Sequence, residues 1–160
     1  MTTQTRPSWE QPFPVLLRAA RAAYGAAVRA ALAEAGFDDM PRQGGFVVTV
    51  IANTGAPLGQ VIGELRMSKQ AGGQLVDSLV TRGYLGRAVD PADRRRLTVS
   101  LTERGMAAAD VVRSVVRRIS DELDERVGPE YVAHARVTVA ALVEISRELR
   151  EAGSEGHGHD

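Results

Sequence analysis

Residues 67–105, MSKQAGGQLVDSLVTRGYLGRAVDPADRRRLTVSLTERG, contain a change of hydrophobic period. Apolar residues recur at steps of three and four after Ser68, whose hydroxyl can accept a backbone N–H as an N-cap. They predict a helix that Gly83 ends. The segments 84–89 and 97–101 predict two strands, the second with strict apolar–polar alternation. The stretch therefore predicts a helix followed by a β-hairpin with a charged tip.

Apolar residues at helical spacing predict five further helices around this stretch. Pro14 suits the first turn of the first helix, and Gly36 ends it. Thr102 caps the helix that follows the hairpin, and Gly128-Pro129 separates that helix from the last one. The predicted helices cover 14–35, 46–53, 57–65, 106–127 and 130–149.

The order of these elements predicts the fold class. A short turn joins the third and fourth helices, as in a helix-turn-helix, and a hairpin follows directly, as in the winged version. We expect a mainly α protein with a small β-hairpin, in which a winged helix-turn-helix domain is flanked by long dimerisation helices. The expected parts are a flexible arm at 1–13, a helical dimerisation region at 14–36 and 106–150, the winged domain at 37–105 and a disordered tail at 151–160.

Five short motifs, in this order and spacing, resemble the MarR family of bacterial transcription regulators. The resemblance implies a protein that binds double-stranded DNA as a homodimer, on a pseudo-palindromic site, and most often acts as a repressor. It also implies a small phenolic or aromatic effector, bound between the winged domain and the dimer helices, that releases the DNA. The motifs are Ser68-Lys69-Gln70, Leu75-Val76-Asp77-Ser78-Leu79, Arg82-Gly83-Tyr84-Leu85, Asp90-Pro91-Ala92-Asp93-Arg94-Arg95 and Leu101-Thr102-Glu103-Arg104-Gly105.

The first turns of the fourth helix carry polar side chains, as a recognition helix in the major groove requires. These residues are Ser68, Lys69, Gln70 and Gln74. A glutamine can pair with adenine through two hydrogen bonds, and Lys69 can reach guanine or a phosphate. Two alternatives stay open: Ser68 is only an N-cap, and Lys69 and Gln70 are only solvated.

The hairpin tip carries the second group of candidate DNA contacts, Asp93, Arg94, Arg95 and Arg96. An arginine next to a recognition helix can enter the adjacent minor groove. The family places such an arginine at the position of Arg95, and an acidic residue that braces it at the position of Asp93. We expect Arg94 to meet a phosphate, whereas the direction of Arg96 depends on strand register. Arg87, on the first strand, has either a DNA contact or a structural role.

Glycines interrupt two of the predicted helices. Gly72 and Gly73 lie inside the recognition helix, where each costs roughly 1 kcal/mol relative to alanine. Either the small residues let the backbone approach the bases, or the helix is frayed and orders only on DNA. Gly44 and Gly45 weaken the prediction for the start of the second helix.

The long outer helices predict a homodimer, because 160 residues cannot easily bury three of them beside a winged domain. Two winged domains about 34 Å apart would meet successive turns of the duplex. The alternative is that the helices close an intramolecular core. Tyr24, Tyr131 and His134 can line the effector pocket, and ordinary packing or surface positions are the alternative for each.

Charge and composition limit the possible functions. The formal charge is zero, but residues 41–105 carry nine basic and five acidic side chains, whereas residues 106–160 carry seven and eleven. A basic middle can hold a phosphate backbone while the acidic end repels it. The absence of cysteine excludes disulfides and cysteine-based peroxide sensing. No apolar run approaches the roughly 20 residues of a membrane span, so we expect a cytoplasmic protein without a membrane partner.

The sequence predicts no enzyme, because it contains no nucleophile–base pair, metal-ligand cluster or phosphate loop. We therefore expect no cofactor and no metal, and His157 and His159 are too sparse for a metal site. The competing function is a winged-helix protein-interaction module without DNA binding. Such a module should lack a basic hairpin tip and polar recognition residues, both of which this chain has.

Overall fold

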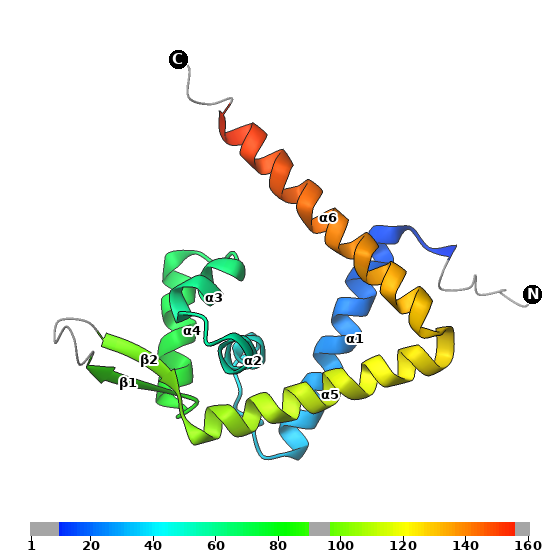
Figure 1. The fold of residues 1–160 in the computed structure, drawn as a ribbon. Helices are drawn as coiled ribbons and strands as arrows, with labels where there is room; N and C mark the ends of the chain where they lie inside the picture. Colours follow the sequence, from blue (N-terminus) through cyan, green and yellow to red (C-terminus); the bar gives the residue numbers. More distant parts are fainter. Residues whose placement is uncertain (1–9, 90–96, 156–160) are drawn as a thin grey trace, which may run out of the picture. The chain divides into compact units, whose positions relative to one another are not determined.

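The computed structural model describes residues 10–89 and 97–155, which form a mainly helical chain with one two-stranded hairpin (Figure 1). The predicted fold class is confirmed. In chain order the elements are α1 (Phe13–Glu34), α2 (Gly44–Thr54), α3 (Leu58–Glu64), α4 (Lys69–Thr81), β1 (Leu85–Val89), β2 (Leu97–Leu101), α5 (Glu103–Val127) and α6 (Pro129–Glu155).

The predicted helix boundaries agree with the structure to within about two residues where a cap or a glycine defines them. Gly83 ends α4 in the left-handed region at φ 74°, and Gly128 separates α5 from α6 at φ 91°. A side chain at either position would be strained, because its Cβ approaches the neighbouring carbonyl oxygen. These two residues explain why the chain turns at the predicted places.

Helix α2 begins at Gly44, two residues before the predicted start at position 46. Gly44 and Gly45 are therefore buried inside the helix, although glycine is a poor helix former. A Cβ on Gly44 would lie 2.6 Å from the sulfur of Met40 and 2.9 Å from Cδ2 of Leu79. Gly44 therefore lets α2 approach α4 closely, whereas Gly45 faces Leu32 and Val112 at ordinary contact distance. This packing offsets the low helix propensity of glycine.

The predicted disordered tail is wrong for residues 151–155, which continue α6 to Glu155. Glutamate and alanine are good helix formers, and they extend a helix that is already nucleated. Residues 156–160 lie outside the described part of the chain, as do residues 1–9 of the expected arm.

The hairpin has the predicted antiparallel pairing. Leu85 pairs with Leu101, Arg87 with Val99 and Val89 with Leu97. This register leads into the loop 90–96, which lies outside the described residues.

The chain divides into two compact units between Val116 and Arg117. The C-terminal end of α1 and the first turns of α5 share one core with the winged elements. This part of the two long helices therefore closes an intramolecular core, which was the alternative to dimerisation. The buried core residues are Leu32, Val47, Val48, Val61, Leu75, Leu79, Tyr84, Leu85, Ala108, Ala109 and Val112.

The second unit consists of the end of α5 and all of α6. In the part whose burial the structure describes, up to Ala152, no residue of α6 is buried. Its exposed large apolar side chains are Tyr131, Val137, Val139, Leu142, Val143, Ile145 and Leu149. Across the described ranges, no helix combines the length and apolar character needed to cross a bilayer.

Candidate nucleic-acid interface

Helix α4, the predicted recognition helix, begins at a side-chain cap. Ser68 has an extended backbone, and its Oγ accepts a hydrogen bond from the backbone N–H of Ala71 at 3.2 Å. Just before it, Arg66 adopts a positive φ of 51°, which turns the chain sharply between α3 and α4. The capping role of Ser68 is confirmed, because this bond satisfies one of the N–H groups that the first turn leaves free.

Helix α4 has one buried and one exposed side. Gly72, Leu75 and Leu79 face the core. On the opposite side, a row of residues is exposed at helical spacing, and we call it the polar stripe: Lys69, Gln70, Gly73, Gln74 and Asp77. Three of the predicted DNA contacts, Lys69, Gln70 and Gln74, thus share a solvent-facing surface. Their contact with DNA stays a prediction.

The two glycines of α4 differ in their surroundings. A Cβ on Gly72 would lie 2.6 Å from Cγ2 of Ile62, so glycine permits the close packing of α3 on α4. A Cβ on Gly73 would have nothing within 4 Å. Gly72 therefore has a role in packing, and the fold itself gives no reason for Gly73.

An ion pair joins the first strand of the hairpin to α4. Nη2 of Arg87 on β1 donates to Oδ1 of Asp77 on α4, and both side chains are exposed, at 43% and 66%. Arg87 thus has a structural partner, which supports the structural alternative for this residue. The predicted wing contacts Asp93, Arg94, Arg95 and Arg96 lie outside the described residues.

The base of the hairpin is held by a cluster that we call the Asp39 cluster: Phe37, Asp39, Arg82, Tyr84 and Arg104. The hydroxyl of Tyr84 donates to Oδ1 of Asp39. Nη2 of Arg104 donates to the same oxygen at 2.8 Å and to the Tyr84 hydroxyl at 3.1 Å. Nη1 of Arg82 donates to the backbone carbonyl of Asp39 at 2.7 Å. The α1–α2 loop is thereby joined to the end of α4, the start of β1 and the first turn of α5.

The hydrogen bonds of this cluster perturb its acid–base groups. The hydrogen bond from Tyr84 has the largest effect and lowers the pKa of Asp39. Desolvation opposes it, and the hydrogen bond and charge of Arg104 lower the pKa further. Burial raises the pKa of the fully buried Tyr84, and its bond to Asp39 raises it further. These shifts favour a carboxylate at Asp39 and a protonated phenol at Tyr84.

Thr102 connects the two ends of the hairpin. Its hydroxyl donates to the carbonyl of Gly83 at 2.5 Å and accepts from the N–H of Gly105 at 3.0 Å. This bond makes Thr102 the cap of α5, as predicted. A Cβ on Gly105 would lie only 2.1 Å from the carbonyl oxygen of Tyr84, so the helix passes directly over the backbone before β1.

Sequence reasoning did not identify the Asp39 cluster or the pairing of Arg87 with Asp77. Tyr84 and Arg104 belong to the motifs quoted above, and nothing in the sequence distinguishes Asp39 from its neighbours. The only available signal was charge pairing, but Asp39 and Arg104 are 65 residues apart. No local spacing rule connects residues at that separation.

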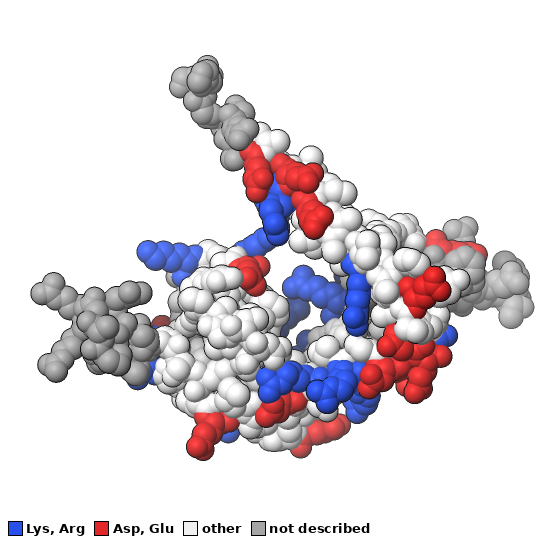
Figure 2. Space-filling model, in the orientation of Figure 1, with Lys and Arg blue, Asp and Glu red and all other residues white. Residues whose placement is uncertain are grey.

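Charged side chains are distributed unevenly over the surface. Figure 2 shows basic side chains at the end of the winged elements where α4 begins. It also shows acidic side chains gathered around the turn between α5 and α6, where Asp121, Glu122, Asp124, Glu125 and Glu130 are exposed. The turn between α5 and α6 therefore presents a negative surface that repels a polyanion.

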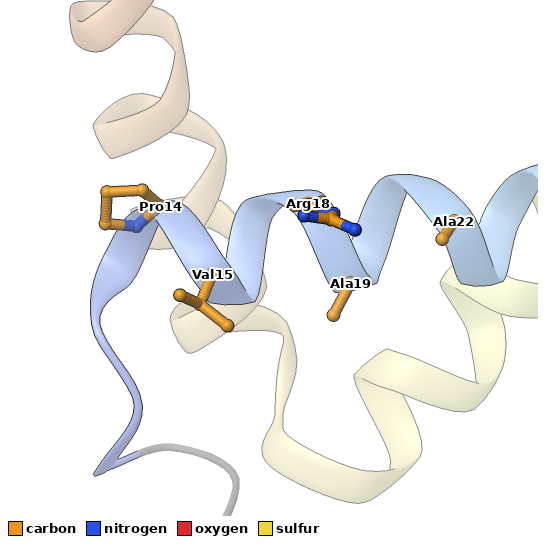
Figure 3. A pocket seen from close by; sticks show the side chains of 5 residues that line it. All are labelled: Pro14, Val15, Arg18, Ala19 and Ala22. Atoms are coloured by element: carbon orange, nitrogen blue, oxygen red, sulfur yellow. The ribbon is translucent and has the colours of Figure 1, made fainter.

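The three predicted effector residues belong to different units of the chain. Tyr24 is half-buried on α1, whereas Tyr131 and His134 are exposed on α6. One surface depression is lined by five residues of α1 alone, Pro14, Val15, Arg18, Ala19 and Ala22, and none of the three effector candidates belongs to it (Figure 3). Within the described ranges, no group of three or more His, Cys, Asp or Glu side chains is placed to hold a metal ion. The effector pocket stays a prediction.

No protein-family model and no curated protein sequence matches the chain. Solved structures match most of it. MepR from S. aureus in complex with DNA has a TM-score of 0.68 and 16% identity, covering 84% of this chain and 98% of MepR. The reduced form of MarR from E. coli has a TM-score of 0.63 and 19% identity, covering 82% and 96%. CouR, a transcriptional repressor bound to a 23-mer DNA duplex, has a TM-score of 0.63 and 20% identity, covering 82% and 92%.

At these identities the likeness establishes the fold. The helix order, the hairpin after α4 and the long helices α5 and α6 all agree with it. The chain has the winged helix-turn-helix fold of the MarR-family transcription regulators.

Proposed function

We propose that this chain is a MarR-family transcription regulator that binds double-stranded DNA in a sequence-specific manner. The observation that carries the proposal is the polar stripe of α4, a solvent-facing row of base-reading residue types on the second helix of a helix-turn-helix. The ion pair between Arg87 and Asp77 supports it, since it links the hairpin to that helix. MepR and CouR, which share the fold, are bound to DNA in their structures.

The active form is a homodimer on a pseudo-palindromic site. The support is the apolar surface of α6, whose large side chains at Val137, Tyr131 and Leu149 are 68–72% exposed in a single chain. Such a surface marks an interface, because exposed apolar area of this extent is unfavourable in water. A two-fold dimer presents two recognition helices in opposite directions, and therefore selects a site with two-fold sequence symmetry.

The regulator represses by occupying its site in the cytoplasm, and a small phenolic or aromatic ligand releases it. CouR, which shares the fold, is a transcriptional repressor. Tyr24, Tyr131 and His134 are the candidate ligand contacts, since aromatic and imidazole rings suit a phenolic partner.

Selection of duplexes from a random pool, followed by fluorescence anisotropy at several salt concentrations, tests DNA binding directly. We expect a preferred sequence whose binding weakens steeply with salt. Gln70→Ala should reduce the preference for that sequence more than the affinity for random duplex, whereas Gln11→Ala, before α1, should change neither. If the folded protein binds no duplex in a salt-sensitive way, the protein-interaction module is the better explanation.

A further inference from the structure

We propose that Gly73 is a specificity-determining residue that contacts the 5-methyl group of a thymine in the major groove. The proposal rests on the proposed function, because it requires α4 to lie in that groove. It begins from the contrast between the two neighbouring glycines of α4, of which only Gly72 is explained by packing.

The fold alone would favour alanine at position 73. A Cβ there would meet nothing within 4 Å, and the residue is not in the left-handed region. Glycine in the interior of a helix costs stability relative to alanine. Residues that break a local rule without a structural gain are expected at functional sites.

The position of Gly73 on the helix indicates what this gain is. Gly73 lies within the polar stripe, four residues after Lys69 and four before Asp77, with Gln70 and Gln74 beside it. The open glycines of α3, Gly59 and Gly63, lie outside this stripe. At Gly73 the stripe therefore has a gap: the long side chains surround it, and the helix backbone is exposed there because glycine has no side chain.

The chemistry of that gap selects an apolar group. In the interior of a helix the backbone N–H and C=O bond to each other, so Gly73 presents only the hydrogens on its Cα. A polar base edge placed there would lose its hydrogen bonds to water without replacement. The thymine methyl is the apolar group that bases present in the major groove. The flanking glutamines suit adenine, so the gap fits an A·T-rich centre of a half-site.

Gly73→Ala tests this inference because folding and binding should change in opposite directions. We expect the melting temperature to rise by about 3 °C, since alanine favours the helix. Affinity for the selected duplex should fall by about tenfold, because the added methyl holds the helix away from the bases. Affinity for random duplex should change less than twofold. Gly25→Ala on α1, where the added methyl meets only the end of the Arg29 side chain, is the matched control and should bind DNA as wild type does.

A scan of the selected duplex, in which each thymine is replaced by deoxyuridine, identifies the methyl group. For the wild type, replacing the thymine at one position in each half-site should weaken binding about fourfold, which corresponds to the free energy of burying one methyl group. Gly73→Ala should no longer respond at that position. A flat scan, unchanged or tighter binding by Gly73→Ala, or a lower melting temperature overturns the inference. If the wild type shows no salt-sensitive binding to any duplex, the proposed function fails instead.

Discussion

The guanidinium of Arg104 lies 4.7 Å from the ring centroid of Tyr84 and donates a 2.8 Å hydrogen bond to Asp39. It also lies 5.4 Å from the ring of Phe37. One side chain on the first turn of α5 thus combines an ion pair with contacts to two aromatic rings. Because Tyr84 immediately precedes β1, the Asp39 cluster determines how the base of the hairpin is held against α5.

This cluster predicts an acid-dependent loss of stability. The folded state lowers the pKa of Asp39, so it binds fewer protons than the unfolded state does. The stabilisation is present above the unfolded value of about 3.9 and is lost as pH falls through the folded pKa. Melting temperatures from pH 7 to pH 3 should show wild type above Asp39→Asn at neutral pH, with a gap that narrows in acid. Asp38→Asn, which changes an exposed neighbour, is the control. A difference in melting temperature between wild type and Asp39→Asn that does not depend on pH would show that the pKa of Asp39 is not lowered in the folded state.

Gly105→Ala should destabilise the fold, because the new Cβ would lie 2.1 Å from the carbonyl oxygen of Tyr84 and 2.9 Å from a methyl of Leu101. Neither a backbone carbonyl nor a packed core side chain can move away without cost. We expect a loss of roughly 3 kcal/mol in urea denaturation. The control Gly63→Ala adds the same methyl in open space and should be neutral or slightly stabilising. Equal stabilities would show that α5 does not pass over this backbone as described.

Asp77→Asn should increase non-specific DNA binding. The substitution removes a negative charge from the polar stripe and releases Arg87 from its ion pair. Log affinity for random duplex should then depend more steeply on log salt, by about one to two phosphate-equivalents. Asp110→Asn makes the same charge change beside Arg113 on α5 and should leave the salt slope unaltered. A slope that rises equally in both variants would indicate only the effect of net charge.

Leu142→Glu should dissociate the homodimer, since this exposed apolar residue lies on the α6 surface that we assign to the interface. The molar mass from light scattering should halve, and affinity for the selected duplex should fall together with it. Arg147→Gln changes the net charge by the same amount on the same helix and should leave a dimer. If Leu142→Glu remains dimeric, another surface forms the interface.

Arg95→Ala tests the predicted wing contact. If the arginine enters the minor groove, its loss should weaken duplex binding. The slope of log affinity against log salt concentration should also become shallower, by about the contribution of one phosphate contact. Arg29→Ala on α1 removes the same charge from an exposed position outside the winged elements and serves as the control. Unchanged affinity and slope for Arg95→Ala would show that this residue makes no contact.

The elements, their order and most of their boundaries could be predicted from short-range patterns in the sequence. The cap at Ser68, the turns at Gly83 and Gly128 and the change from helical to strand period depend on residues within about four positions of one another. Such short-range effects can be read along a chain, which is why the fold class could be predicted from it. The same holds for the polar residues Lys69, Gln70 and Gln74 on the first turns of α4, whose contact with DNA stays a prediction.

Contacts between residues that are far apart in the sequence could not be predicted and depend on how the elements pack. Asp39 bonds to Tyr84 at a separation of 45 residues and to Arg104 at 65. Gly72 and Gly73 are equivalent in the sequence, and they differ because Ile62 packs against one of them. Even the boundary between the two units depends on this packing, since the first turns of α5 belong to the winged core. Periodicity shows that a helix has an apolar side, but what covers that side depends on contacts between distant segments.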